Sequence, residues 1–405
     1  MRLRLGFAVL ALGLLRTTPA CADDKARIEA EAQGQAVQAD RLYKAGEYAA
    51  AIPFYQAERV SRAAAGDRRF EAYALRAIGC CHEQLGDDDA AIEAWREASV
   101  LDAKREDRGY EGYDLFMIGR AHLRRGRLDR AQDILKKALP LLATAVDRDH
   151  EADAQFVLAL AYLKDDRPED AAPHAERAEA LANALDDPRR RASAWLALGH
   201  IALGRASPGL AAERFLDARA GFEETDSPGD AALADRGLAE ALDWLEHPDA
   251  ATFFARAALA EHRALGDDSA VADDLRVLIQ VRVNAGDQAE TVRYARQIVE
   301  AQQAVGDLVG EVDARVELAQ YQVLAGDADA AWTTLEEAVR LARQGVPAAR
   351  RVRLLLLAEQ LGRDHGHVAR ADELLDEADR VANAADNGAL RRLVKDARAS
   401  RGGKR

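Results

Sequence analysis

A repeat with a period of about 40 residues runs through most of this chain, and it limits the possible folds more than any other feature of the sequence. One position of the repeat has the character of a turn, and six of the nine residues that occupy it are glycine. The nine positions are Gly46, Gly86, Gly126, Asp166, Ala206, Glu246, Gly286, Gly326 and Gly366. Five residues after each of them, eight of the nine residues are alanine. Self-similarity at such a period predicts an array of supersecondary units that stack on one another.

A second turn lies half a period after the first and divides each repeat into two segments. It contains Gly66, Gly266 and Gly306, and each of these glycines is followed by aspartate. Glycine suits the left-handed residue that ends a helix, and aspartate suits the residue that caps the start of the next helix. Each repeat is therefore expected to form two helices of about 17 residues, each about 25 Å long.

Three prolines and one apolar column keep the same register as these turns. Pro168, Pro208 and Pro248 stand two residues after the first turn, where a helix tolerates proline because its first N–H groups have no helical partner. The apolar column lies eight residues before the first turn and contains Ile78, Ile118, Leu158, Leu198, Leu238, Leu278 and Leu318. We expect this column to fill the space between repeats, while the small alanines let the two helices of a repeat approach closely. The sequence thus predicts an all-α solenoid of antiparallel helix pairs.

The pattern resembles the tetratricopeptide repeat (TPR) superfamily, in its long variety with about 40 residues per repeat. The resemblance is carried by residues 77–87 (AIGCCHEQLGD) with Ala91, and by residues 321–327 (YQVLAGD) with Ala331. It covers nearly all of the chain after the N-terminus. It implies a right-handed superhelical solenoid of about nine TPR-like repeats, and it indicates a fold more specifically than a function.

The domain organisation expected on this basis has four parts. A segment at residues 1–22 precedes the solenoid, which extends over residues 23–386. A charged helix at residues 387–400 would cap the array, because a terminal repeat needs a polar outer face. Residues 401–405 would form a disordered tail.

The N-terminal segment has the pattern of a secretory signal peptide. Two arginines among the first four residues precede an apolar run of eleven residues at 5–15, and a small-residue triplet follows at 20–22. Eleven apolar residues are too few to span a bilayer, which takes about 20. We therefore expect cleavage after Ala22 and export to the periplasm or out of the cell.

Two other interpretations of the N-terminus stay open. Cys21 is acylated if the protein is a lipoprotein, although Thr18 stands where such signals usually carry leucine. An uncleaved N-terminus would instead make the protein a cytoplasmic regulator.

Charge and cysteine content exclude several functional classes. Removing the three arginines of residues 1–22 changes the net charge from −14 to −17, which argues against a nucleic-acid partner. Beyond residue 22 only the adjacent pair Cys80 and Cys81 remains, so the fold has no disulfide framework. The two imidazoles of His365 and His367 are too few for a specific metal site.

Catalytic and cofactor motifs are also missing from the sequence. It contains neither a glycine-rich phosphate loop after a strand nor a nucleophile elbow. We therefore expect no cofactor, no bound metal and no enzymatic activity.

In the family that the chain resembles, the first helix of each repeat lines a concave groove that binds peptides. The corresponding columns lie 13, 10, 6, 3 and 2 positions before the first turn. The partner-binding residues predicted from them are Tyr73, Arg76, Tyr113, Phe116, Arg120, Arg124, Phe156 and Lys164. The same columns contain Cys80, Leu123, Asp153, Leu160, Leu163, Leu196, His200 and Leu203. Clustered aromatic residues and arginines are typical of binding surfaces, but Phe116, Phe156 and Leu196 are also compatible with packing between repeats.

These observations favour an exported interaction scaffold that binds a protein or peptide partner. The inner columns of repeats two and three lack the asparagine with which some family members hold a peptide carboxylate, so that mode of binding is not supported. The alternative is a structural spacer or a self-assembling element of the cell envelope. The sequence indicates neither the identity of the partner nor an oligomeric state.

Overall fold

The computed structural model describes residues 19–145 and 148–402, and within these ranges the chain forms 19 helices and no strand. The predicted all-α fold of consecutive helix pairs is therefore confirmed. Residues 1–18 of the predicted signal peptide, the second turn of the third repeat at 146–147 and the end of the predicted tail at 403–405 lie outside the described residues. In the part that is described, no helix is both long and apolar enough to cross a membrane.

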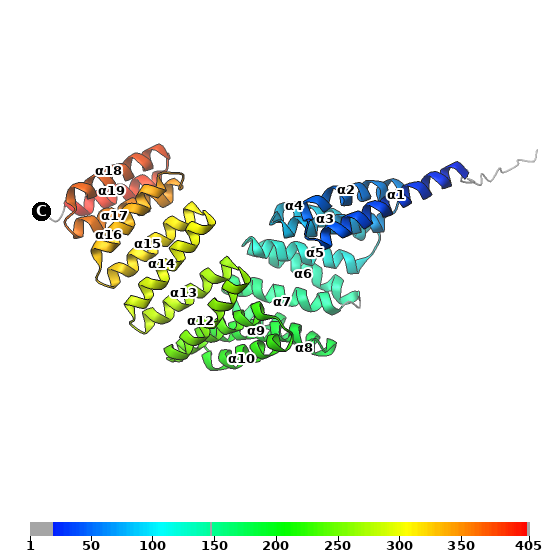
Figure 1. The fold of residues 1–405 in the computed structure, drawn as a ribbon, viewed down its shortest axis with the longest axis horizontal. Helices are drawn as coiled ribbons and strands as arrows, with labels where there is room; N and C mark the ends of the chain where they lie inside the picture. The colour runs from blue at the N-terminus through cyan, green and yellow to red at the C-terminus, as the bar shows by residue number, and fades with distance from the viewer. Residues whose placement is uncertain (1–18, 146–147, 403–405) are drawn as a thin grey trace, which may run out of the picture. The chain divides into compact units, whose positions relative to one another are not determined.

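The chain forms two compact units, residues 1–190 and 191–405, which are considered separately. Consecutive helices pack side by side in the first unit (Figure 1). Its helices are α1 (Pro19–Lys44), α2 (Tyr48–Ala65), α3 (Arg68–Gln84), α4 (Asp88–Lys104), α5 (Arg108–Arg124), α6 (Leu128–Thr144), α7 (Arg148–Lys164) and α8 (Pro168–Leu185).

The second unit repeats the same arrangement. Its helices are α9 (Pro188–Gly204), which begins just before the division, α10 (Pro208–Glu224), α11 (Pro228–Trp244), α12 (Pro248–Leu265), α13 (Asp268–Asn284), α14 (Gln288–Val305), α15 (Leu308–Leu324), α16 (Ala328–Ala342), α17 (Ala348–Asp364), α18 (Val368–Ala384) and α19 (Gly388–Gly402). Helix α19 packs against α17 and α18, and its buried Leu390 and Val394 join the core cluster of those helices. It extends to Gly402, so the first two residues of the predicted tail are helical.

The helix boundaries follow from the turn chemistry of the sequence. Aspartate caps the start of α4, where the Asp87 side chain accepts a hydrogen bond from the Ala90 N–H at 3.1 Å. Turn residues other than glycine also adopt the left-handed conformation, among them Asp166 at φ +55° and Ala206 at φ +53°. Stacking thus imposes the left-handed turn even where a side chain makes it unfavourable.

Size complementarity between the two helices of a repeat organises much of the core. A methyl group added to Gly79 would lie 2.4 Å from the Trp95 ring, and one added to Gly199 would lie 2.6 Å from the Phe215 ring. Trp95 and Phe215 are both fully buried. The fourth repeat instead carries alanine at both of these positions, Ala159 and Ala175. The Trp95 and Phe215 rings therefore occupy space that a missing Cβ leaves open.

Candidate binding groove

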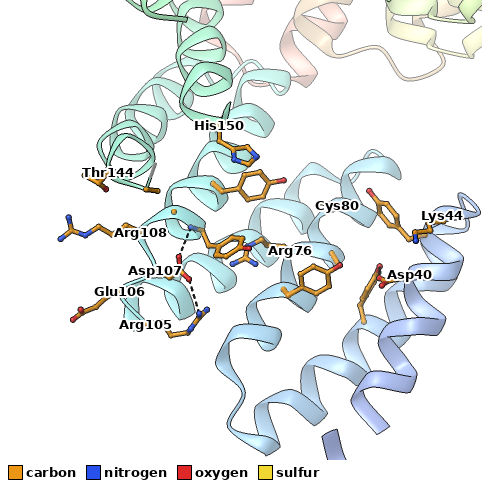
Figure 2. Close-up of a pocket in the computed structure, with 18 residues that line it drawn as sticks. Asp40, Lys44, Arg76, Cys80, Arg105, Glu106, Asp107, Arg108, Thr144 and His150 are labelled. Atoms are coloured by element: carbon orange, nitrogen blue, oxygen red, sulfur yellow. Dashed lines mark hydrogen bonds and ion pairs between the residues drawn. The ribbon is translucent and has the colours of Figure 1, made fainter. Parts of the chain in front are cut away.

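A groove of about 1310 Å³ opens on the inner side of the first unit. It is formed by the C-terminal end of α1, by α2 and α3, by the turn before α5 and the start of α5, by the C-terminal end of α6 and by the start of α7. The charged end of α1, with Asp40 and Lys44, lies on one side, and the turn that contains Glu106 and Arg108 lies on the other, with Arg76 between them (Figure 2). The remaining lining residues are Tyr43, Tyr55, Tyr73, Ala77, Cys80, Arg105, Asp107, Gly109, Tyr110, Tyr113, Thr144, Ala145 and His150.

Tyrosine dominates this lining. Tyr73 and Tyr110 expose 46% and 44% of their surface, so their rings are accessible from solvent. Tyr113 is half-buried and packs edge-on against His150, with ring centroids 4.6 Å apart. An aromatic ring with a polar edge offers a large contact area and a hydrogen-bonding group at a low entropic cost.

Most of these tyrosine hydroxyl groups have no partner in the part of the protein that the structure describes. Tyr55 donates a hydrogen bond of 2.7 Å to Asp40 Oδ1. The hydroxyl groups of Tyr43, Tyr73, Tyr110 and Tyr113 bond to no other group among the described residues. Burial raises the pKa of Tyr113 to about 12 and also raises the pKa of Tyr43 and Tyr73. These phenols stay protonated at neutral pH and are available as donors.

Arg76 forms the floor of the groove, and two buried carboxyl groups compensate the charge of its guanidinium. Its Nε donates to Asp114 Oδ1 at 2.8 Å, and its Nη2 pairs with Asp102. Both carboxyl groups are fully buried, and Arg105 donates a second hydrogen bond to Asp102 at 2.6 Å. The Arg76 guanidinium also lies 4.3 Å from the centroid of the Tyr110 ring. These interactions occupy the guanidinium of Arg76 inside the protein. Arg76 therefore serves mainly to position the Tyr110 ring, and little of its charge is available to a ligand.

Burial also changes the protonation of this cluster. It raises the pKa of Asp114 to about 8, even though the Arg76 guanidinium favours the ionised form. Burial raises the pKa of Asp102 as well, against the same guanidinium. Burial thus favours the protonated form of Asp114 and reduces the negative charge beneath the groove.

The structure brings three of the eight predicted partner-binding residues together in the groove: Tyr73, Arg76 and Tyr113. Three others lie elsewhere. Phe116 is 4% exposed, so its predicted exposure on the inner surface is wrong, and its ring packs between helices. Arg120 forms hydrogen bonds of 2.6 and 2.8 Å with Glu83, and Arg124 is shared between Glu83 and Asp88. Arg120 and Arg124 are thus already paired with carboxylates.

Phe156 is half-buried and Lys164 is exposed on α7, and neither lines the groove. Partner binding by these two residues stays a prediction. Leu196 and His200 belong to the second unit, where the His200 ring packs edge-on against Phe215 at 4.9 Å. Among the residues described here, no group of three or more potential metal ligands occurs, and the His367 ring stacks on Trp332 at 4.7 Å.

Sequence reasoning missed three of the five tyrosines that line the groove: Tyr43, Tyr55 and Tyr110. The predicted columns belong only to the first helices of repeats two to five. The available signal was the distribution of tyrosine, because six of the nine tyrosines of the chain precede residue 114. Tyr43 also occupies an inner column of the first repeat, three residues before Gly46.

Comparison with known proteins supports the family resemblance. Residues 114–184 match the model of the tetratricopeptide repeat family. Among solved structures, the chain is similar to a STAND signal-transduction ATPase with a tetratricopeptide repeat sensor from Pyrococcus horikoshii, at 13% identity and a TM-score of 0.56. That match covers 85% of this chain and 55% of the ATPase, so the chain spans about half of the length of that protein.

Two further structures match over most of both chains. One is a Rap protein complexed with competence and sporulation factor, at 14% identity and a TM-score of 0.55, with 92% of this chain and 99% of that chain covered. The other is the apo form of the quorum sensor NprR from B. thuringiensis, at 12% identity and a TM-score of 0.56, with 76% and 87% covered. Comparison with curated proteins found no match. The comparisons thus show a tetratricopeptide repeat match at residues 114–184 and a fold shared with these solved structures over most of the chain.

Proposed function

We propose that this protein is an exported, non-catalytic scaffold that binds a protein or peptide partner in the groove of its first unit. The observation that carries the proposal is the lining of that groove, where four tyrosine hydroxyl groups have no partner in the described protein. Tyr43 and Tyr113 are half-buried, and such phenols usually find a hydrogen-bond partner. A ligand that lies across the rings would supply it.

Two structural relatives support a binding role. The Rap structure is that of a complex with competence and sporulation factor, and NprR is described as a quorum sensor. Both are proteins of the same fold. Recognition of another molecule is therefore a use to which this architecture is suited.

Affinity capture with two matched baits tests the proposal. Residues 23–405 serve as the first bait in native extract, and the second bait carries Tyr73→Ser and Tyr110→Ser. Because both side chains are more than two-fifths exposed, the variant is expected to fold normally, as circular dichroism would verify. We expect a partner that the first bait retains and the second loses. A control bait with Phe54→Ser and Phe253→Ser removes two exposed rings outside the groove and should retain the partner.

A partner that both groove baits retain would place the binding site outside the groove and contradict the proposal. Absence of any partner would favour the alternative, a structural spacer in the cell envelope.

Export is the second part of the proposal, and it rests on the basic, then apolar, then small-residue pattern of residues 1–22. We expect the intact mass of the protein isolated from its source to correspond to residues 23–405. Full-length protein in the cytosolic fraction would rule export out. An added mass of acyl chains at Cys21 would indicate a lipoprotein instead.

A further inference from the structure

The lining of the groove differs from that of a site for an amphipathic helix. Five of the lining residues are tyrosine, and none of the described lining residues is leucine, isoleucine, valine, methionine or phenylalanine. A helix that docks in a groove buries bulky aliphatic anchors in apolar pockets. Flat rings with polar edges suit instead a ligand that presents broad apolar faces and hydrogen-bond acceptors side by side.

The charges of the groove do not favour a strongly charged ligand. Four cationic and three anionic side chains line it, and the fully buried Asp102 lies behind two of the cations. Arg76 and Arg105 are both paired with Asp102, and Arg105 also contacts Asp107 at 3.3 Å. A site with balanced charges exerts little long-range attraction on either an acidic or a basic segment.

The geometry points to a proline-rich segment in the polyproline conformation as the ligand of this groove, a proposal that rests on the proposed binding function. Proline rings stack on aromatic side chains, and a polyproline helix has no internal hydrogen bonds, so its carbonyl groups are free to accept. The phenols of Tyr43, Tyr73, Tyr110 and Tyr113 are the donors without a partner in the described protein. The stiffness of the segment also limits the entropy lost on binding.

Fluorescence anisotropy with a labelled ten-residue proline peptide tests this assignment on residues 23–405. We expect saturable binding that changes less than about twofold between low and high salt, because no net charge is recognised. The double variant Tyr73→Ser, Tyr110→Ser should weaken binding about tenfold or more, since it removes two stacking surfaces. Tyr113→Phe should weaken binding about threefold to tenfold, because it removes one hydroxyl donor and keeps the ring. The control Phe54→Ser, Phe253→Ser should bind as the parent does.

Four results would overturn the assignment. They are no binding of the proline peptide at millimolar protein, binding that the tyrosine variants leave unchanged, tighter salt-sensitive binding of a ten-residue glutamate or lysine peptide, and binding of cellohexaose in preference to the proline peptide. The last would show that the rings stack on sugar instead of proline.

Failure of this inference can be told apart from failure of the proposed function. If the proline peptide does not bind but the captured partner is still lost with the tyrosine variant, the groove is a binding site and only the ligand class is wrong. If the captured partner is also retained by the variant, both proposals fail together.

Discussion

Replacement of Phe215 by alanine should lower the free energy of unfolding by about 3–5 kcal/mol, the usual cost of a cavity left by a large aromatic side chain. Phe215 is fully buried in α10. Its ring fills the space over two glycines, since a methyl group added to Gly199 or to Gly237 would lie 2.6 or 2.5 Å from it. These glycines belong to α9 and α11, so the loss would loosen three consecutive helices. Urea unfolding followed by circular dichroism measures the effect.

A matched control and a second variant sharpen this prediction. Phe253→Ala makes the same chemical change at a side chain that is 67% exposed and should alter stability little. Gly199→Ala should itself destabilise by about 1–3 kcal/mol, because the added methyl group overlaps the ring. Combined with Phe215→Ala, the Gly199→Ala substitution should cost much less than it does alone. Equal costs in both backgrounds would show that the ring and the glycine are not in contact.

Replacement of Arg76 by methionine should destabilise the protein by about 3 kcal/mol, because removal of one partner from a buried ionic cluster leaves the others uncompensated. Asp114 would lose its only hydrogen-bond partner among the described residues, and Asp102 would keep only Arg105. The matched control is Arg96→Met, which removes an exposed ion pair with Glu93 and should change stability little.

The cost of Arg76→Met should also depend on pH. In the folded parent protein the pKa of Asp114 is raised to about 8, so the stability linked to this group is full at acid pH and falls until about pH 8. Loss of the guanidinium should raise that pKa further, so the stability of the variant continues to fall above pH 8 while that of the parent levels off. The difference should widen by at most about 1.4 kcal/mol per pH unit. A constant difference between pH 7 and pH 9 would mean that Asp114 does not titrate in this range.

The helices could be predicted from sequence because their ends are encoded locally. A left-handed turn residue, a capping aspartate or a first-turn proline marks most of the described boundaries, and none of these signals depends on distant contacts. Even Asp166 and Ala206, which lack the favourable glycine, follow the register of their neighbours. The division of the chain at Arg190 had no comparable local signal, because Pro188 begins a helix there as other prolines do elsewhere.

The groove was predictable only in part, because its walls come from several helices. The repeat register singled out Tyr73 and Tyr113, and both line the groove. It could not indicate that Arg76 would be held by Asp102 and Asp114, which lie 26 and 38 residues away in the sequence. Nor could it separate Phe116 from Tyr113 on the same helix, because only the packing of neighbouring helices decides which ring is covered.

The pairing of a small residue on one helix with a large residue on the next has a consequence for how such a chain can change. Gly79 and Trp95 belong to the two helices of one repeat, so gain or loss of a whole repeat keeps them together. Exchange of a single helix separates them. If α7 replaced α3, the methyl group of Ala159 would meet the Trp95 ring at the position where Gly79 now leaves room. For this contact the helix pair, and not the helix, is thus the smallest segment that recombination can move, whereas Phe215 would also have to keep Gly237 of the following repeat.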